Sequence, residues 1–139
     1  MKDFKKYSSI EDHYQNKFIE KAVAQYPNIS TETFIVLEKI DGANIQLLFT
    51  PDGTYKVGRR TSWLSKDESF YDIWNTLEKY KDMVEFFQNM SKLSNDTIRL
   101  YGELYGKGIQ RRINYGEEKY IKIFDFICRK PEDKIEEYR

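Results

Sequence analysis

The chain has 139 residues, of which 40% are hydrophobic and 33% charged, so it forms one globular domain or part of one and is not intrinsically disordered. Its 23 basic and 23 acidic residues balance, which excludes a global positive field, so a polyanion site requires local clusters of basic side chains. The single cysteine excludes an internal disulfide, and we expect neither a membrane span nor a signal peptide because the chain has no long apolar run and begins with polar residues.

The first predicted element is a helix near the N-terminus. Ser8 and Glu11 have the spacing of a capping box, which places the helix start near Ser9. Apolar side chains then recur at every fourth position, at Ile10, Tyr14, Phe18 and Ala22. We expect Pro27 to end this helical segment, because proline disfavours helix in the residue before it.

Three predicted strands follow, separated by turns. Thr33–Lys39 and Ala43–Phe49 are rich in β-branched and aromatic residues, and glycine in the intervening Lys39-Ile40-Asp41-Gly42 marks a tight turn. A second turn, Pro51-Asp52-Gly53, precedes the strand Thr54–Arg59.

The second half of the chain predicts a long helical segment and two more strands. The apolar residues of Asp67–Met90 recur at spacings of three and four, which indicates a helical stripe that packs into the core. Ile98–Tyr105 alternates between an apolar and a polar face, Gly106–Gly116 is a glycine-containing loop, and Tyr120–Ile127 is apolar on both faces, as in a buried central strand. The elements together predict an α+β fold with a mainly antiparallel sheet and two flanking helices.

Lys39 is the strongest candidate for covalent chemistry. A lysine amine attacks phosphorus only when it is neutral, and a glycine three residues later lets a phosphate approach the backbone closely. The pattern Lys-x-Asp-Gly is short and arises by chance, so a solvated lysine before a turn is the favoured interpretation when the pattern is taken alone.

Other candidates lie on later segments, and each has a simpler alternative. Glu103 could accept two hydrogen bonds from a ribose, or could pair with Arg99. Phe124 could stack on a purine, or could be an ordinary core residue. The adjacent Arg59 and Arg60 could hold phosphates, or could mark a solvated strand end.

Four segments, in this order, resemble motifs I, Ia, III and IIIa of the covalent nucleotidyltransferases, which include polynucleotide ligases and mRNA capping enzymes. Residues 4–9, 17–21, 108–110 and 115–116 are in addition similar to the phage-type RNA ligase 2 family, so the resemblance extends over nearly the whole chain. It implies a partial adenylation domain with an ATP-grasp-like fold. The four motif segments are Glu38–Asn44, Gly58–Thr61, Tyr101–Gly106 and Ile123–Phe126.

The resemblance implies an ATP-dependent RNA ligase. Lys39 would attack the α-phosphorus of ATP, and the AMP would then pass to an RNA 5′-phosphate that a 3′-hydroxyl attacks, with magnesium neutralising the triphosphate. The RNA would be a nicked duplex or a pair of broken ends. The implied catalytic residues are Lys39, Asp41 and Asn44, and the implied ATP- or AMP-binding residues are Glu38, Lys39, Ile40, Asn44, Arg60, Glu103 and Phe124. The predicted RNA- or phosphate-binding residues are Arg59, Arg60, Arg111 and Arg112, which form the two local basic clusters of the sequence; the resemblance itself matches Arg60 to a family arginine.

The sequence departs from the family pattern in two ways. Aspartate stands at position 41, where the phage enzyme has histidine, but aspartate is the commoner choice in the superfamily. The family's motif IV glutamate, its motif V lysines and its C-terminal domain lie beyond the region that this chain covers. We therefore expect residues 1–139 to be the N-terminal part of the adenylation domain, and to form the lysine–AMP adduct poorly or not at all alone.

Three alternatives remain open. The chain could belong to a DNA ligase or a capping guanylyltransferase, could be a nucleotide- or RNA-binding remnant without catalysis, or could be an unrelated α+β domain with chance motifs. A partial domain would expose a sheet edge after Ile127, which predicts a homo-oligomer. We expect a cytoplasmic location, or a phage or viral gene product that acts in the host cytoplasm.

Overall fold

A computed structural model describes residues 3–10 and 14–130 of the chain. The chain divides into two compact units. Residues 3–6 and 40–130 form one of them, here called the sheet unit, and residues 7–39 form the other, here called the N-terminal unit. Because each unit is compact in its own right, each is described by itself.

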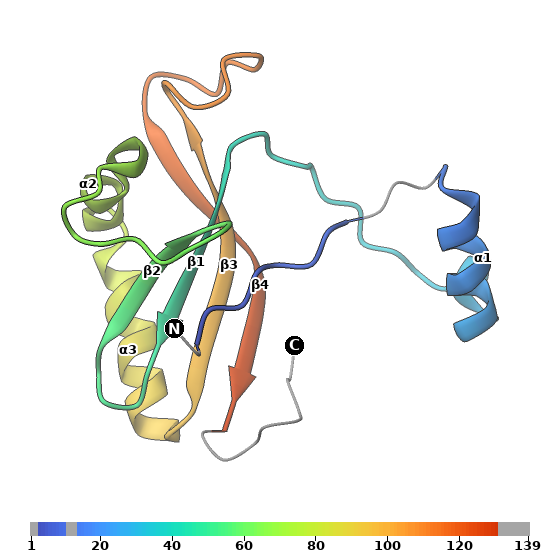
Figure 1. Ribbon diagram of the computed structural model, residues 1–139, viewed down its shortest axis with the longest axis horizontal. Coiled ribbons are helices and arrows are strands. Elements are labelled where there is room, and N and C mark those ends of the chain that lie inside the picture. The colour runs from blue at the N-terminus through green and yellow to red at the C-terminus, as the bar shows by residue number, and fades with distance from the viewer. Residues whose placement is uncertain (1–2, 11–13, 131–139) are drawn as a thin grey trace. The chain divides into compact units, whose positions relative to one another are not determined.

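The sheet unit contains a four-stranded antiparallel sheet with the order β2-β1-β3-β4 (Figure 1). The strands β1, β2 and β3 confirm three predicted strands to within a few residues, with Ile45 opposite Arg59 on one side and Gly102 on the other. The observed bounds are β1 Ala43–Phe49, β2 Tyr55–Arg59, β3 Thr97–Gly106 and β4 Lys119–Arg129.

Helices cover one face of this sheet and build the core with it. The predicted helical segment 67–90 is divided into a short 3-10 turn, Phe70–Asp72, followed by α2, Ile73–Glu78, and α3, Lys81–Ser94. Three successive residues at 70–72 have positive φ, so a regular helix cannot extend back to Asp67. The predicted apolar stripe is confirmed as core, with Ile73, Leu77 and Val84 packed against Ile45, Leu47, Phe49, Ile98, Leu100 and Leu104.

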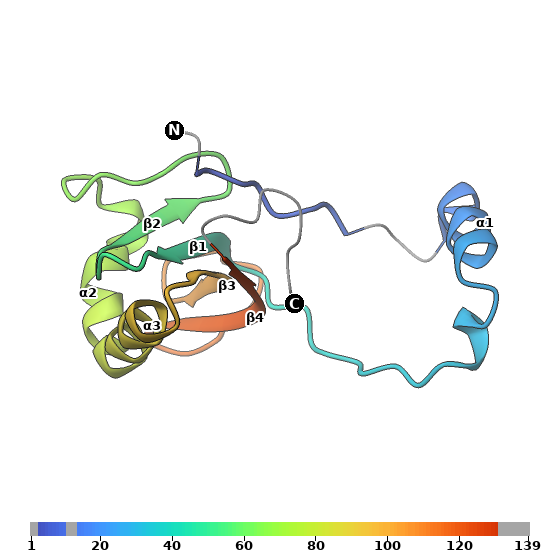
Figure 2. The same cartoon turned by 90° about the horizontal axis from the view of Figure 1, so that it is seen from below.

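The opposite face of the sheet carries polar side chains, and the segment Asp3–Lys6 crosses it. The Tyr101 hydroxyl donates to the Lys5 carbonyl oxygen at 2.7 Å, and Arg99 donates to the Asp3 carbonyl oxygen. The Asp3 carboxylate also lies 3.0 Å from the Lys56 ammonium. Figure 2 shows this segment and α3 on opposite sides of the sheet.

Tyr120–Ile127 is confirmed as a strand, β4, but the prediction that this strand is buried and central in the sheet is wrong. Within the described residues, β4 pairs only with β3 and is an edge strand. Its ladder is interrupted by a bulge, because Tyr101 pairs with Asp125 whereas Gly102 pairs with Ile123, and Phe124 is the extra residue. The bulge reverses which positions face the helices, so Ile121, Ile123, Phe126 and Cys128 all join the core. This reversal makes the sequence look apolar on both faces.

The N-terminal unit contains α1, Asn16–Gln25, and a 3-10 turn, Ile29–Thr31. The helix ends before Pro27 as predicted, but it begins at Asn16 rather than near Ser9, and Glu11 of the predicted capping box lies outside the described residues. The predicted strand Thr33–Lys39 is wrong, since this segment has no ladder partner among the described residues. No described helix combines the length and apolar character needed to cross a membrane.

Candidate nucleotide site

The turn that leads into β1 is the centre of the candidate site. Gly42 lies against β3, and a Cβ atom there would come within 2.3 Å of the Leu104 carbonyl oxygen. The Gly42 N–H donates to Oε1 of Glu103 at 3.2 Å. The absence of a side chain at Gly42 therefore allows the motif I turn to contact the motif III strand directly.

The strand register brings further polar residues to the same part of the sheet. Asn44 lies opposite Glu103 in the β1–β3 ladder, and Glu103 lies opposite Lys122 in the β3–β4 ladder. Directly opposed residues on one face have Cβ atoms about 4.5–5.5 Å apart. The amide of Asn44, the carboxylate of Glu103 and the ammonium group of Lys122 thus form a row across three strands. Lys122 was not predicted from the sequence as a site residue.

Phe124 has the exposure expected of a stacking residue. Its side chain is 41% exposed, so the alternative that it is an ordinary core residue is wrong. Its position as the extra residue of the β4 bulge explains this exposure, because a bulge redirects a side chain without ending the strand.

The two arginines after motif Ia differ. The Arg59 Nε donates to Oγ of Ser62 at 2.9 Å, and its Nη1 lies 3.5 Å from a carboxylate oxygen of Glu68. These contacts give Arg59 a structural role in the loop after β2. Arg60 is exposed just beyond the end of that strand.

Arg111 and Arg112 both lie in the loop between β3 and β4, and only Arg112 contacts the candidate site. Its Nη2 lies 2.9 Å from Oδ2 and 3.2 Å from Oδ1 of Asp41. Tyr115 and Gln110 of the same loop also reach the turn, and the sequence analysis gave neither of them a role. Both residues lie in segments that carried the family resemblance, 108–110 and 115–116, and this resemblance was the sequence signal that could have predicted their role.

Glu38 and Lys39 are the last residues of the N-terminal unit, and both are exposed. The peptide bond between Lys39 and Ile40 joins them to the candidate site in the sheet unit. The structure thus brings Asp41, Asn44 and Glu103 together, whereas the predicted roles of Glu38, Lys39 and Ile40 remain predictions.

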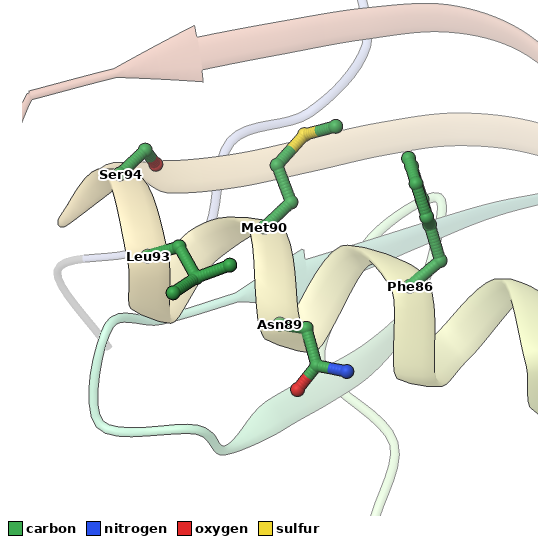
Figure 3. Close-up of a pocket in the computed structure, with 5 residues that line it drawn as sticks. All are labelled: Phe86, Asn89, Met90, Leu93 and Ser94. Carbon is green, nitrogen blue, oxygen red and sulfur yellow. The ribbon is translucent and has the colours of Figure 1, made fainter.

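The described residues contain no group of three or more His, Cys, Asp or Glu side chains that could hold a metal ion. Asp41 is paired with Arg112, and Glu103 accepts from the Gly42 N–H. The site residues therefore do not fit a magnesium centre by themselves. A separate shallow groove on α3 is lined by Phe86, Asn89, Met90, Leu93 and Ser94 and includes none of the predicted site residues (Figure 3).

Comparison with known proteins identifies the family. A family model described as RNA ligase matches residues 32–138. The chain belongs to the RNA ligase family. The RNA ligase match includes all four motif segments that carried the resemblance.

Solved structures of an RNA ligase from Naegleria gruberi have a similar fold. An apo variant superposes with a TM-score of 0.62 at 21% identity, over 88% of this chain and 33% of that one. A variant with AMP and manganese gives 0.60 at 20% identity, over 88% and 34%. A third, with ATP and manganese, gives 0.51 at 23% identity, over 63% and 24%. The chain spans about a third or less of the Naegleria ligase, and the likeness confirms the predicted α+β fold of part of a ligase adenylation domain.

Proposed function

We propose that this RNA ligase family chain is the nucleotide-binding part of an ATP-dependent ligase of the RNA ligase 2 type, with Lys39 as the nucleophile. The observation that carries the proposal is the contact between motifs I and III. The N–H of Gly42, three residues after Lys39 in the chain, donates to Glu103, and the contact with β3 leaves no room for a side chain at Gly42. A nucleophile and a ribose-binding carboxylate must be neighbours if both are to act on one nucleotide.

In the proposed first step, the neutral amine of Lys39 attacks the α-phosphorus of ATP. A nitrogen–phosphorus bond forms, the bond between the α-phosphorus and the oxygen that bridges to the β-phosphate breaks, pyrophosphate leaves, and the amine loses one proton to solvent. Glu103 would accept hydrogen bonds from the ribose hydroxyls, and Phe124 would stack on the adenine. Magnesium, for which the described residues form no site by themselves, would neutralise charge on the triphosphate when bound.

In the later steps, the AMP would pass to an RNA 5′-phosphate and then be displaced by a 3′-hydroxyl. Asn44 lies in the same row as Glu103, which suits a role near the reacting phosphate. Arg60 and Arg111 are exposed and could bind the RNA backbone, since a guanidinium offers planar paired donors to a phosphate.

Intact mass spectrometry after incubation with ATP and magnesium tests the nucleophile. A gain of about 329 Da, the mass of one AMP residue, is expected on the reactive lysine of the covalent intermediate. Lys39→Ala should abolish the gain, while Lys17→Ala, a matched change of an exposed lysine in α1, should not. A gain that persists in Lys39→Ala would exclude Lys39 as the nucleophile.

The described residues hold no group of three or more His, Cys, Asp or Glu side chains that could bind a metal ion, so we also propose that residues 1–139 form the adduct weakly. The expected result is that a small fraction of the 139-residue chain carries the gain, and that this fraction disappears in Lys39→Ala. A robust adduct on the short chain would contradict this. Comparing ATP with GTP separates a ligase from a capping guanylyltransferase.

The second candidate is a nucleotide- or RNA-binding remnant. The lack of a carboxylate cluster among the described residues favours it. A remnant would bind ATP or RNA in calorimetry and form no adduct.

Within the described residues, one edge of β4 has no neighbouring strand, and we propose association between copies of the chain through this edge. Light scattering tests the association, and a monodisperse monomer would contradict it.

A further inference from the structure

The loop between β3 and β4, residues 107–118, is firmly anchored rather than projecting freely. At its base, the Lys107 N–H donates to the Glu118 carbonyl oxygen at 3.0 Å, and the Lys107 ammonium lies 2.9 Å from the Glu117 carboxylate. Ile109 is 1% exposed and belongs to the hydrophobic core. The loop therefore has the support needed to hold another segment in place.

The ring of Tyr115 adds a second anchor. It packs edge-to-face on Tyr105 with the ring centroids 5.1 Å apart, and Tyr105 in turn lies 5.5 Å from the ring of Tyr120. Three tyrosines from β3, the loop and β4 thus form one cluster. The cluster fixes the direction of the Tyr115 hydroxyl group, which points at the motif I turn.

Side chains satisfy the backbone polar groups of that turn. The Asp41 N–H donates to the Tyr115 hydroxyl at 3.0 Å, and the Gly42 N–H donates to Glu103. The Gly42 carbonyl oxygen accepts from the Gln110 side chain at 3.4 Å. The conformation of the turn is therefore set by residues of β3 and of the loop.

Arg112 also contacts the motif I turn, from an exposed position in the loop. One of its nitrogens contacts both oxygens of Asp41, whose side chain is 26% exposed, while the Arg112 side chain is 77% exposed. The sequence predicted Arg112 as an RNA- or phosphate-binding residue. Its contact with Asp41 connects the loop to the residue two positions after Lys39, and the predicted phosphate-binding role of Arg112 stays a prediction.

We propose that residues 107–118 are a clamp on the motif I turn, and that Tyr115 and Arg112 are positioning residues for it. The catalytic consequence, placement of Lys39, rests on the proposed function, whereas the clamp itself does not. A reacting group displaced by about 1 Å can lose about a hundredfold in rate. Fixed side chains thus hold Asp41 and Gly42, which are the second and third residues after Lys39 in the chain.

Amide hydrogen exchange measured by NMR tests the clamp without any catalysis. Tyr115→Phe keeps the ring but removes the acceptor of the Asp41 N–H, so exchange at Asp41 should accelerate about five- to tenfold, as expected for one lost hydrogen bond. Tyr120→Phe removes a hydroxyl from the same cluster and should leave Asp41 unchanged. Arg112→Ala should accelerate exchange at Asp41, Arg112→Lys should accelerate it less, and Arg111→Ala should not. Equal exchange at Asp41 in Tyr115→Phe and Tyr120→Phe would overturn the clamp.

Adduct formation by the same variants tests positioning. Tyr115→Phe should lower the rate constant of Lys39–AMP formation about tenfold with little change in the KM for ATP, because the turn and not the nucleotide pocket is loosened. Faster exchange with an unchanged rate would overturn the positioning role. If no protein forms an adduct, the proposed function fails, and the exchange result still decides whether the clamp exists.

Discussion

Similar apolar residues are buried in one unit of this chain and exposed in the other. In β1 of the sheet unit, Ile45, Leu47 and Phe49 are fully buried. In the N-terminal unit, the run Phe34-Ile35-Val36-Leu37 has an equally strong preference for strand, yet these side chains are 63–91% exposed. The helices differ in the same way, since α3 buries Val84 and Ser91 whereas α1 buries no residue.

The difference shows what a strand-like pattern requires before it becomes a strand. β1 lies between β2 and β3, and it has helices on one face. The segment at 33–39 has the composition of a strand but no ladder partner among the described residues. Strand propensity describes the fit of a side chain to a half-buried pleated surface, so without such a surface it has no effect.

The largest expected effect comes from making the same substitution in both units. Ile98→Ala removes a fully buried side chain from the core of β3 and should lower the free energy of unfolding by about 2–5 kcal/mol. Ile35→Ala changes a side chain that is 87% exposed and should stay within about 0.5 kcal/mol of the parent. Urea unfolding followed by far-UV circular dichroism measures both, because α1 of the N-terminal unit also contributes to that signal, whereas the two tryptophans report only on the sheet unit.

Equal losses in the two isoleucine variants would show that the segment at 33–39 is buried in solution. The comparison between the units would then fail, and the predicted strand at Thr33–Lys39 would have to be reconsidered. A loss only in Ile98→Ala would establish that the sheet unit alone carries the cooperative core.

A second prediction concerns Gly42, which lies next to the junction of the units. An alanine Cβ would approach the Leu104 carbonyl oxygen to 2.3 Å, and the backbone must shift to accommodate it. Gly42→Ala should destabilise the sheet unit by about 1–3 kcal/mol, as expected for overpacking. Gly108→Ala is the control for the loss of a glycine, because nothing lies within 4 Å of a Cβ there, although its φ of +80° adds some strain of its own. A loss in Gly42→Ala no larger than that in Gly108→Ala would contradict the close contact between motifs I and III.

The sequence predicted most of the sheet unit and part of the candidate site. The strands at 43–49, 54–59 and 98–105 and the apolar stripe of 67–90 were confirmed because the residues that pair with them lie within the chain. The bulge at Phe124 could not be predicted from the sequence. It inserts one residue into β4, so the alternating side chains point to opposite faces of the sheet before and after it, and the apolar pattern then looks like that of a strand buried on both faces. Asp41 and Arg112 are 71 residues apart in the sequence. They meet because the loop folds back onto the turn, so no local sequence pattern predicts this pair.

A third, smaller effect should separate the ends of the two helices. Asn95, which directly follows α3, has φ 59° and ψ 28°, whereas Tyr26, which directly follows α1, has a φ of −133°. A left-handed residue at a helix end favours glycine, so Asn95→Gly should stabilise the sheet unit by a few tenths of a kcal/mol and Asn95→Ala should destabilise it by about 1 kcal/mol. Tyr26→Gly should leave the free energy of unfolding of the sheet unit unchanged. Thermal unfolding measures all three, and equal values for Asn95→Gly and Asn95→Ala would contradict the left-handed end of α3.

The smallest expected effect is a dependence of stability on pH that belongs to the sheet unit. Asp52, in the turn between β1 and β2, accepts hydrogen bonds from the Thr50 hydroxyl, the Thr54 N–H and the Thr54 hydroxyl. These bonds, that from Thr50 first, lower the pKa of Asp52 from its ordinary 3.8 to about 2. A carboxylate whose pKa is depressed by folding contributes stability above its unfolded pKa and loses that contribution as the pH falls through its folded pKa. The contribution of Asp52 should thus be complete above pH 4 and disappear between pH 4 and pH 2.

Two variants test this assignment by urea unfolding between pH 2 and pH 5. Asp52→Asn keeps an acceptor oxygen but cannot titrate, so the part of the slope due to this turn should vanish. Thr50→Val removes the first of the three donors, so the folded pKa of Asp52 should rise toward its unfolded value. The loss of stability on acidification should then still begin near pH 4, but it should end at a higher pH than in the parent and be smaller in total. If both variants retain the slope of the parent, the acid sensitivity of the sheet unit has its origin in a carboxylate other than Asp52, and the turn between β1 and β2 does not contribute to it.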